Sequence, residues 1–181
     1  MQIELSLNEI RAVAGYAAAC ARPALAIFES EFPDDNRPGI AIEVAQDFAE
    51  GAARTKTIRD NAWAVQRAAH EARVAGKTAA SEAARAALAA CGAAFLHPLP
   101  KATQVKHILG SAGHAARAFE LSAGENTTGS AHLERACALA NPTVIAVLRR
   151  YPEAPAGGGR VGELIRQLDA SLRPMVGKVD Q

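Results

Sequence analysis

The chain has 181 residues, of which 43 are alanine and only 4% are aromatic. Alanine loses no side-chain entropy in a helix, so this composition is typical of helices that pack closely through small side chains. It argues against a β-sandwich, which needs many β-branched and aromatic residues. A hydrophobic fraction of 49% with 22% charged residues excludes a wholly disordered chain, and the length favours one domain.

The net charge of +1 conceals an uneven distribution along the chain. Residues 1–50 carry a net charge of −6, residues 51–117 carry +7, and the remainder is balanced. In one interpretation the acidic N-terminal helices pack against the basic middle helices, or the charges are simply solvated. In the other, the basic middle segment faces an anionic partner or ligand. Nucleic acid is not indicated, because the isoelectric point is only 7.8 and basic and aromatic residues do not alternate.

No targeting or membrane signal is visible in the sequence. Residues 1–5 lack the basic and apolar regions of a secretory signal. The longest uncharged apolar run, Ala86 to Leu96, is much shorter than the ~20 residues that span a bilayer. Cys20, Cys91 and Cys137 form no CxxC pair, so we interpret them as reduced, buried thiols. We therefore expect a cytoplasmic protein with no membrane contact.

The first predicted helix begins at a capping box. Ser6 is placed to accept from an early backbone N–H, and Glu9 to reach back to the cap. Arg22-Pro23 is expected to break or kink this helix, so that a short second piece covers Ala24 to Phe32.

The next helix follows a proline-rich turn. Asn36 is its predicted N-cap, and it is expected to end near Gly51. Its predicted buried stripe consists of Ile40, Val44 and Phe48, which recur at helical spacing.

Further helices are predicted over about 53–75, 78–96, 101–122, 131–140, 142–150 and 161–172. Gly76 is expected to stop the first of these, and Asn141 with Pro142 to open the fifth. The last is expected to bury Leu164, Ile165, Leu168 and Leu172. No strand is predicted.

Together these patterns predict an all-α fold, a single compact domain of about seven to nine helices packed as antiparallel hairpins. The domain is expected to cover residues 1–173. Within it, residues 152–160 are rich in Pro and Gly and are expected to form a flexible loop, and residues 174–181 a frayed tail.

The densest polar segment suggests a candidate slot made of His97, Lys101, Thr103, Gln104, His107, Ser111 and His114. The four residues from Thr103 to His114 are separated by four, four and three positions, so they share one helix face. In the functional interpretation the histidines transfer protons near neutral pH and Lys101 anchors an anion. In the structural interpretation the histidines are hydrogen-bonded between packed helices. The sequence alone leaves both open.

Other reactive groups are weakly supported. Two histidines at i and i+7 with no nearby carboxylate or Cys do not make a metal site, so we expect neither metal nor cofactor. No nucleophile elbow or acid partner accompanies Ser111, and no catalytic residue is assigned. Gly157-Gly158-Gly159-Arg160 could present N–H groups to a phosphate, but a flexible linker is the preferred interpretation. Trp63 is expected to border the core rather than to be an exposed anchor.

A candidate basic surface comprises Arg54, Lys56, Arg59, Lys106 and Arg117. Several segments around it resemble the Imm-5-like family of bacterial immunity proteins: Arg54-Thr55-Lys56, Ala62-Trp63-Ala64, Phe95 to Leu99, Lys101 to Leu109 and His114 to Arg117. The resemblance covers nearly the whole chain and is weakest at residues 76–90 and 122–140. It implies a role in binding and neutralising a cognate toxin in the same cell, and it carries no catalytic residues across.

Three functions follow as hypotheses. The first is an immunity protein whose partner is a toxin. The second is a small-molecule-binding protein or enzyme that uses the polar slot in a cleft between helices. The third is a helical module that associates with itself. The first and second differ in whether the polar groups meet in an open pocket or are satisfied between packed helices.

Overall fold

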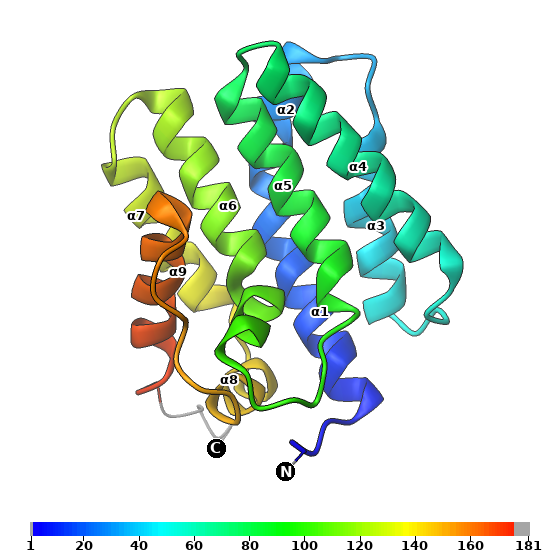
Figure 1. The fold of residues 1–181 in the computed structure, drawn as a ribbon, viewed down its shortest axis with the longest axis vertical. Coiled ribbons are helices and arrows are strands. Elements are labelled where there is room, and N and C mark those ends of the chain that lie inside the picture. Colours follow the sequence, from blue (N-terminus) through cyan, green and yellow to red (C-terminus); the bar gives the residue numbers. More distant parts are fainter. Residues whose placement is uncertain (1, 176–181) are drawn as a thin grey trace.

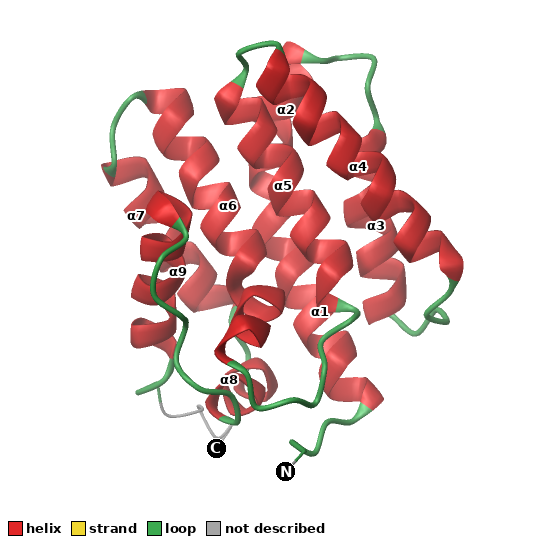
Figure 2. Cartoon of the chain, viewed as in Figure 1, coloured by secondary structure: helices red, strands yellow, loops and turns green. Residues whose placement is uncertain are grey.

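The computed structural model describes residues 2–175, and these residues form helices and loops with no strands (Figures 1 and 2). The predicted all-α fold is confirmed. In chain order the helices are α1 (Leu7–Ala21), the 3-10 turn η1 (Arg22–Ala24), α2 (Leu25–Glu31), α3 (Arg37–Ala49), α4 (Lys56–Val74), α5 (Thr78–Ala93), the 3-10 turn η2 (Ala102–Gln104), α6 (Val105–Ala123), α7 (Thr127–Leu139), α8 (Pro142–Arg149) and α9 (Gly159–Leu172). Most of the predicted tail, residues 176–181, lies outside the described residues.

Local capping signals define several helix ends as predicted. The Ser6 hydroxyl accepts from the Glu9 N–H, and the Glu9 carboxylate accepts from the Ser6 N–H, which completes the capping box of α1. The Asn141 side chain accepts from the Val144 N–H at 2.9 Å and caps α8. After α4, Gly76 adopts a φ of +76°, which side chains with a Cβ disfavour.

Helix α1 is the centre of the domain and contacts α3, α5 and α6 (Figure 1). Together with η1 and α2 it makes the stretch Leu7–Glu31, the one helix in the described part of the chain that is long and apolar enough to cross a membrane by length and composition. Half of its apolar window is buried inside the fold. Packing in the core accounts for an apolar composition of this kind.

Helices α5 and α6 pack with little space between them because small residues face each other. The Ser111 hydroxyl of α6 donates to the Ala86 carbonyl of α5 at 2.8 Å. Gly110 lies against Ala89, since a Cβ built there would be 3.5 Å from the Ala89 Cβ. The alanine-rich composition is therefore used for close helix packing, as the sequence predicts.

Helix α3 departs from two predictions. Asn36 precedes the helix but makes no capping bond with its side chain; instead, the Asp35 carboxylate accepts from the Arg37 N–H at 3.1 Å. Ile40 is 37% exposed, whereas Ile42 is buried with Ala41 and Ala45. The buried stripe is shifted because the helix packs on α1 and α5 through small residues as well as large ones.

Helix α9 covers one side of α6 and is connected to the preceding loop by side-chain bonds. A Cβ built on Gly113 of α6 would lie 2.6 Å from Ile165, so only glycine fits at this crossing. The Asp169 carboxylate accepts from the Ala154 N–H, and Arg166 donates to the carbonyls of Pro155 and Gly157. The flexibility predicted for residues 152–160 stays a prediction. The predicted buried face of α9, from Leu164 to Leu172, is confirmed.

Candidate functional site

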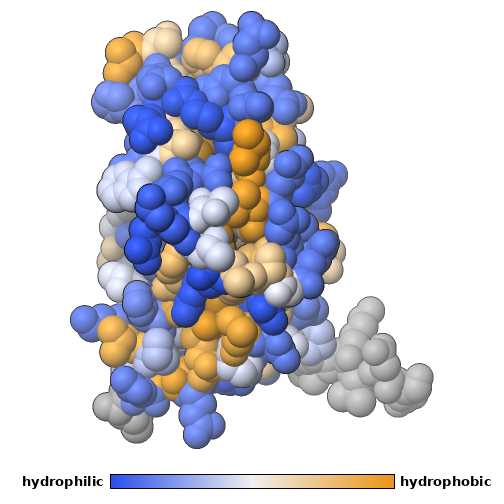
Figure 3. Space-filling view, turned by 90° about the vertical axis from the view of Figure 1, so that its right-hand side faces the viewer, coloured by the Kyte–Doolittle hydropathy of each residue, from blue (hydrophilic) through white to orange (hydrophobic). Residues whose placement is uncertain are grey.

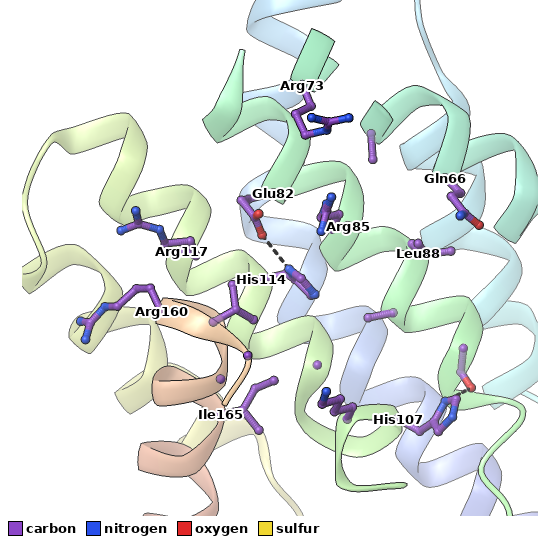
Figure 4. A pocket seen from close by; sticks show the side chains of 18 of the residues that line it. Gln66, Arg73, Glu82, Arg85, Leu88, His107, His114, Arg117, Arg160 and Ile165 are labelled. Carbon is purple, nitrogen blue, oxygen red and sulfur yellow. Dashed lines mark hydrogen bonds and ion pairs between the residues drawn. The ribbon is translucent and has the colours of Figure 1, made fainter. Parts of the chain in front are cut away.

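A groove with a volume of about 1110 Å³ opens between α4, α5, α6 and the start of α9 (Figure 4). Its lining combines apolar side chains such as Leu88 and Ile165 with histidines and cations. Small residues of the closely packed α5 and α6, including Gly92 and Gly110, also line it. A concave site with an apolar lining and a few polar groups is typical of ligand and partner sites.

Two histidines of α6, His107 and His114, lie in this groove about two helical turns apart. His114 and Glu82 of α5 are joined by a hydrogen bond of 2.6 Å between Nδ1 and the carboxylate (Figure 4). His107 donates from Nδ1 to the Gly92 carbonyl at 2.8 Å, because a carbonyl only accepts. Burial lowers the pKa of His107, so its ring is neutral at pH 7. In both histidines Nδ1 is occupied and Nε2 has no hydrogen-bond partner among the described residues.

Two arginines at the groove edge form ion pairs with a buried carboxylate. Arg160 of α9 and Arg117 of α6 both bind Glu120, at 2.6 and 3.0 Å, and the Glu120 side chain is only 1% exposed. Burial raises the pKa of Glu120, but the hydrogen bonds from the two arginines outweigh it and the pKa is lowered. In Figure 4 both arginines extend away from His114. They therefore hold α6 and α9 together rather than face a ligand.

Three other cations around the groove have no such partner. Arg73 of α4, Arg85 of α5 and Lys106 of α6 all line it, and none lies within 4.0 Å of a carboxylate in residues 2–175. Glu82 is the one carboxylate in the lining, and it is bound to His114. The groove thus has an excess of positive charge that the fold itself does not neutralise.

The structure does not bring the seven predicted slot residues together. His107 and His114 lie in the groove, but Ser111 is buried against α5. Gln104 is buried and accepts from the His97 N–H, and the His97 carbonyl in turn accepts from the Tyr151 hydroxyl. The remaining members of the slot, Lys101 and Thr103, are exposed and do not line the groove. Two of the predicted slot residues are therefore groove histidines, whereas His97 and Gln104 form structural hydrogen bonds just before the start of α6.

The predicted basic surface is likewise divided. Lys106 and Arg117 line the groove, whereas Arg54 and Arg59 lie over the ring of Phe95 beside a smaller hollow of about 370 Å³. Arg54 also donates to the Ala94 carbonyl at 3.0 Å. Lys56 pairs with Asp60 at 3.6 Å on the exposed surface of α4.

The acidic N-terminal segment neutralises the basic middle segment at one position. Among the ion pairs of residues 2–175, only Lys77 with Glu31, at 2.7 Å, joins a cation from residues 51–117 to a carboxylate from residues 1–50. Mutual neutralisation therefore does not explain the positive charge of the middle segment, which leaves solvation or an external anionic partner.

The prediction that Trp63 borders the core is wrong. Trp63 is 58% exposed on α4, and Val74, at the end of the same helix, is 69% exposed. With Arg59, Arg67 and His70 they form an exposed stripe, because the five positions are separated by four, four, three and four residues. Figure 3 shows the side of the molecule that lies to the right in Figure 1, where small hydrophobic areas lie among hydrophilic residues. We call these five residues the α4 stripe.

Sequence reasoning assigned neither Glu82 nor Arg85 to a site, and it did not place Arg73 and Arg160 in a common groove, because the four residues belong to three different helices and match no shared local motif. The Gly157–Arg160 segment is the sequence signal that lies nearest to the site, and its residues Gly158 and Arg160 line the groove. No group of three or more His, Cys, Asp or Glu side chains capable of holding a metal occurs in residues 2–175.

A family model described as "Imm-5 like putative immunity protein" matches residues 4–141. The chain belongs to this family. The Imm-5-like match runs from just before α1 to the end of α7, so it includes α4, α5 and α6 and excludes α9. No curated protein and no solved structure gives a significant match.

Proposed function

We propose that this Imm-5-like protein is a cytoplasmic immunity protein that binds a cognate toxin and blocks its activity. Membership of the family supports the role, and the exposed α4 stripe supports a particular contact surface. Tryptophan and arginine are the residues most enriched at the centres of protein interfaces, and an exposed Trp63 beside Arg59 and Arg67 offers both.

The observation that carries this proposal is the exposure of Trp63. A tryptophan that is 58% exposed leaves a large apolar surface in water, at a cost of free energy that burial against a partner would recover. Arg59 and Arg67 beside it form no ion pair within residues 2–175. This arrangement favours a toxin whose contact surface is apolar at the centre and acidic at the rim.

The proposal is tested by capture followed by neutralisation. The tagged full chain is used to isolate its partner from the native cytoplasm, and the partner is then expressed in a host with and without the immunity protein. We expect the partner alone to arrest growth and the wild-type chain to restore it. A partner that is harmless alone, or whose toxicity the wild-type chain leaves unchanged, would overturn the proposal.

Variants then locate the surface. Trp63→Ala should weaken toxin binding at least ~10-fold, which corresponds to about 1.4 kcal/mol. The matched control is Leu139→Ala, which removes a 42% exposed apolar side chain from α7 on the other side of the domain (Figure 1) and should leave the affinity unchanged. Equal effects of the two variants would contradict the α4 stripe as the contact surface.

A further inference from the structure

We propose that the groove between α4, α5, α6 and α9 is a binding site for a small, multiply charged anion, a molecule with two or more carboxylate or phosphate groups. The site adjoins the α4 stripe, because His70 belongs to both, but the proposal does not depend on the toxin-binding function.

The first argument is the placement of the three cations that no carboxylate reaches in residues 2–175. Arg73 has the ring of His70 as a hydrogen-bond partner, at 3.3 Å. Arg73, Arg85 and Lys106 come from three different helices and line one hollow, so their charges converge on a common volume. The three side chains are exposed to water, and their like charges repel one another across the hollow, which raises the free energy of the empty site. An anion that contacts several of them removes this repulsion, which favours a ligand with more than one negative group.

The second argument is that other cations at the groove edge are neutralised by carboxylates of the protein itself. Glu120 forms ion pairs with Arg117 and Arg160, and the exposed Glu163 forms a further ion pair with Arg160 at 3.0 Å. No comparable carboxylate reaches the other three cations within the described residues, and Glu82 is bound to His114. The cations that stabilise the fold and those that face the groove are thus different residues.

The third argument concerns the two histidines. The Glu82 and Gly92 oxygens fix the rings of His114 and His107 through Nδ1, which leaves each Nε2 available to a ligand. The neutral ring of His107 offers an acceptor at Nε2, suited to a hydroxyl or an amide of the ligand. Side chains whose orientation is fixed by a second partner are typical of preorganised binding sites, since such side chains lose little conformational entropy when a ligand binds.

The fourth argument is the position of α9. Residues of its first turn, including Gly158 and Gly162, line the groove, so the N-terminal end of a 14-residue helix lies at the edge of the site. The partial positive charge of a helix N-terminus favours a bound anion. Apolar side chains, Leu88 and Ile165 among them, provide surface for a carbon skeleton. The lining therefore offers both charged and apolar surface to a small anion.

The test is isothermal titration of the purified full chain at 0.15 M salt with two probes, citrate for the carboxylate class and pyrophosphate for the phosphate class. Acetate, with a single charge, is the negative control. Binding of citrate or pyrophosphate, but not of acetate, is expected, and the probe that binds more tightly identifies the class. Absence of binding by both probes would overturn the proposal.

The site is located by a pair of double variants with the same change in net charge. Arg85→Gln with Lys106→Gln should weaken binding of the preferred probe at least 10-fold. Lys56→Gln with Arg59→Gln, which removes two cations from outside the groove, should change it less than 2-fold. Circular dichroism verifies that both variants are folded. Equal loss in the two variants would show that binding follows overall charge only and would overturn the site.

Discussion

Two clusters of cations lie on neighbouring sides of α6, and they differ in whether a carboxylate of the protein neutralises them. On the side of α7 and α9, Arg117 and Arg160 bind the buried carboxylate of Glu120. On the side of α4 and α5, Arg85 and Lys106 line a groove and have no carboxylate within 4.0 Å in the described chain. The first cluster is expected to contribute to stability and the second to binding. The presence of arginine alone does not distinguish these roles, whereas the location of the nearest carboxylate does.

The largest effect is expected from a substitution that removes the carboxylate of the first cluster. Glu120→Ala should lower the free energy of unfolding by about 2 to 4 kcal/mol, because it leaves two arginines without their buried partner. Denaturant unfolding of the purified protein measures this difference. The control is Glu163→Ala, which removes a 54% exposed carboxylate from the same arginine and should cost less than about 1 kcal/mol. Similar losses for the two variants would contradict the structural role of Glu120.

A pH-dependent effect arises from His132 of α7, which is buried beside Phe119 with no partner for Nε2 among the described residues. Burial, with a smaller contribution from Arg135, lowers the pKa of His132 from 6.5 to about 4. Between these values the unfolded chain binds more protons than the folded chain. The stability is therefore fully present above pH 6.5 and is lost as the pH falls towards 4, by up to about 3 kcal/mol.

The measurement is the free energy of unfolding between pH 7 and pH 4.5 for the wild type and for His132→Phe, which keeps an aromatic ring beside Phe119. The variant should lose less stability over this range, with a residual slope from His107, whose pKa is also lowered by burial. An identical slope in the two proteins would exclude His132 as the source.

Two glycines of α6 contact different helices, Gly113 facing α9 and Gly110 facing α5, so their variants test the two contacts separately. Gly113→Ala should destabilise the protein by about 1 to 3 kcal/mol, since the new Cβ would overlap Ile165. Gly110→Ala meets Ala89 at an ordinary contact distance and should be neutral or stabilising by up to about 1 kcal/mol, because alanine favours the helix. Thermal unfolding of both variants tests this difference, and equal effects would mean that α9 does not pack on α6 at Gly113.

The smallest expected effect concerns Ser111, which the sequence places in the same slot as His107 and His114. Ser111→Ala should cost about 1 kcal/mol of stability, through loss of the bond to the Ala86 carbonyl. It should leave the binding of citrate or pyrophosphate unchanged. A loss of anion binding without loss of stability would place Ser111 in the site instead of in the packing.

The parts of the structure that the sequence predicts correctly depend on neighbours in the chain. The capping box at Ser6, the N-cap at Asn141 and the stop at Gly76 are each defined within four residues. The buried face of α9 follows from helical spacing alone. These features need no knowledge of the tertiary fold.

The features that the sequence does not predict depend on packing between distant helices. Ile40 and Ile42 are equally apolar, and only the contact of α3 with α1 and α5 decides which is buried. Trp63 is exposed for the same kind of reason. The groove itself needs α4, α5, α6 and α9 to meet, so Arg73 and Glu82 carry no local signal of their place in it. Of the predicted slot, only His107 and His114 lie in this groove.

The most direct test of the difference between the two clusters is the free energy of unfolding of Arg85→Gln with Lys106→Gln, measured in the absence of any added anion. Removal of two mutually repelling cations should leave stability equal to that of the wild type or raise it by up to about 1 kcal/mol. A loss of about 2 kcal/mol or more would show that these cations support the fold, as Arg117 and Arg160 do, and would contradict their assignment to a binding site.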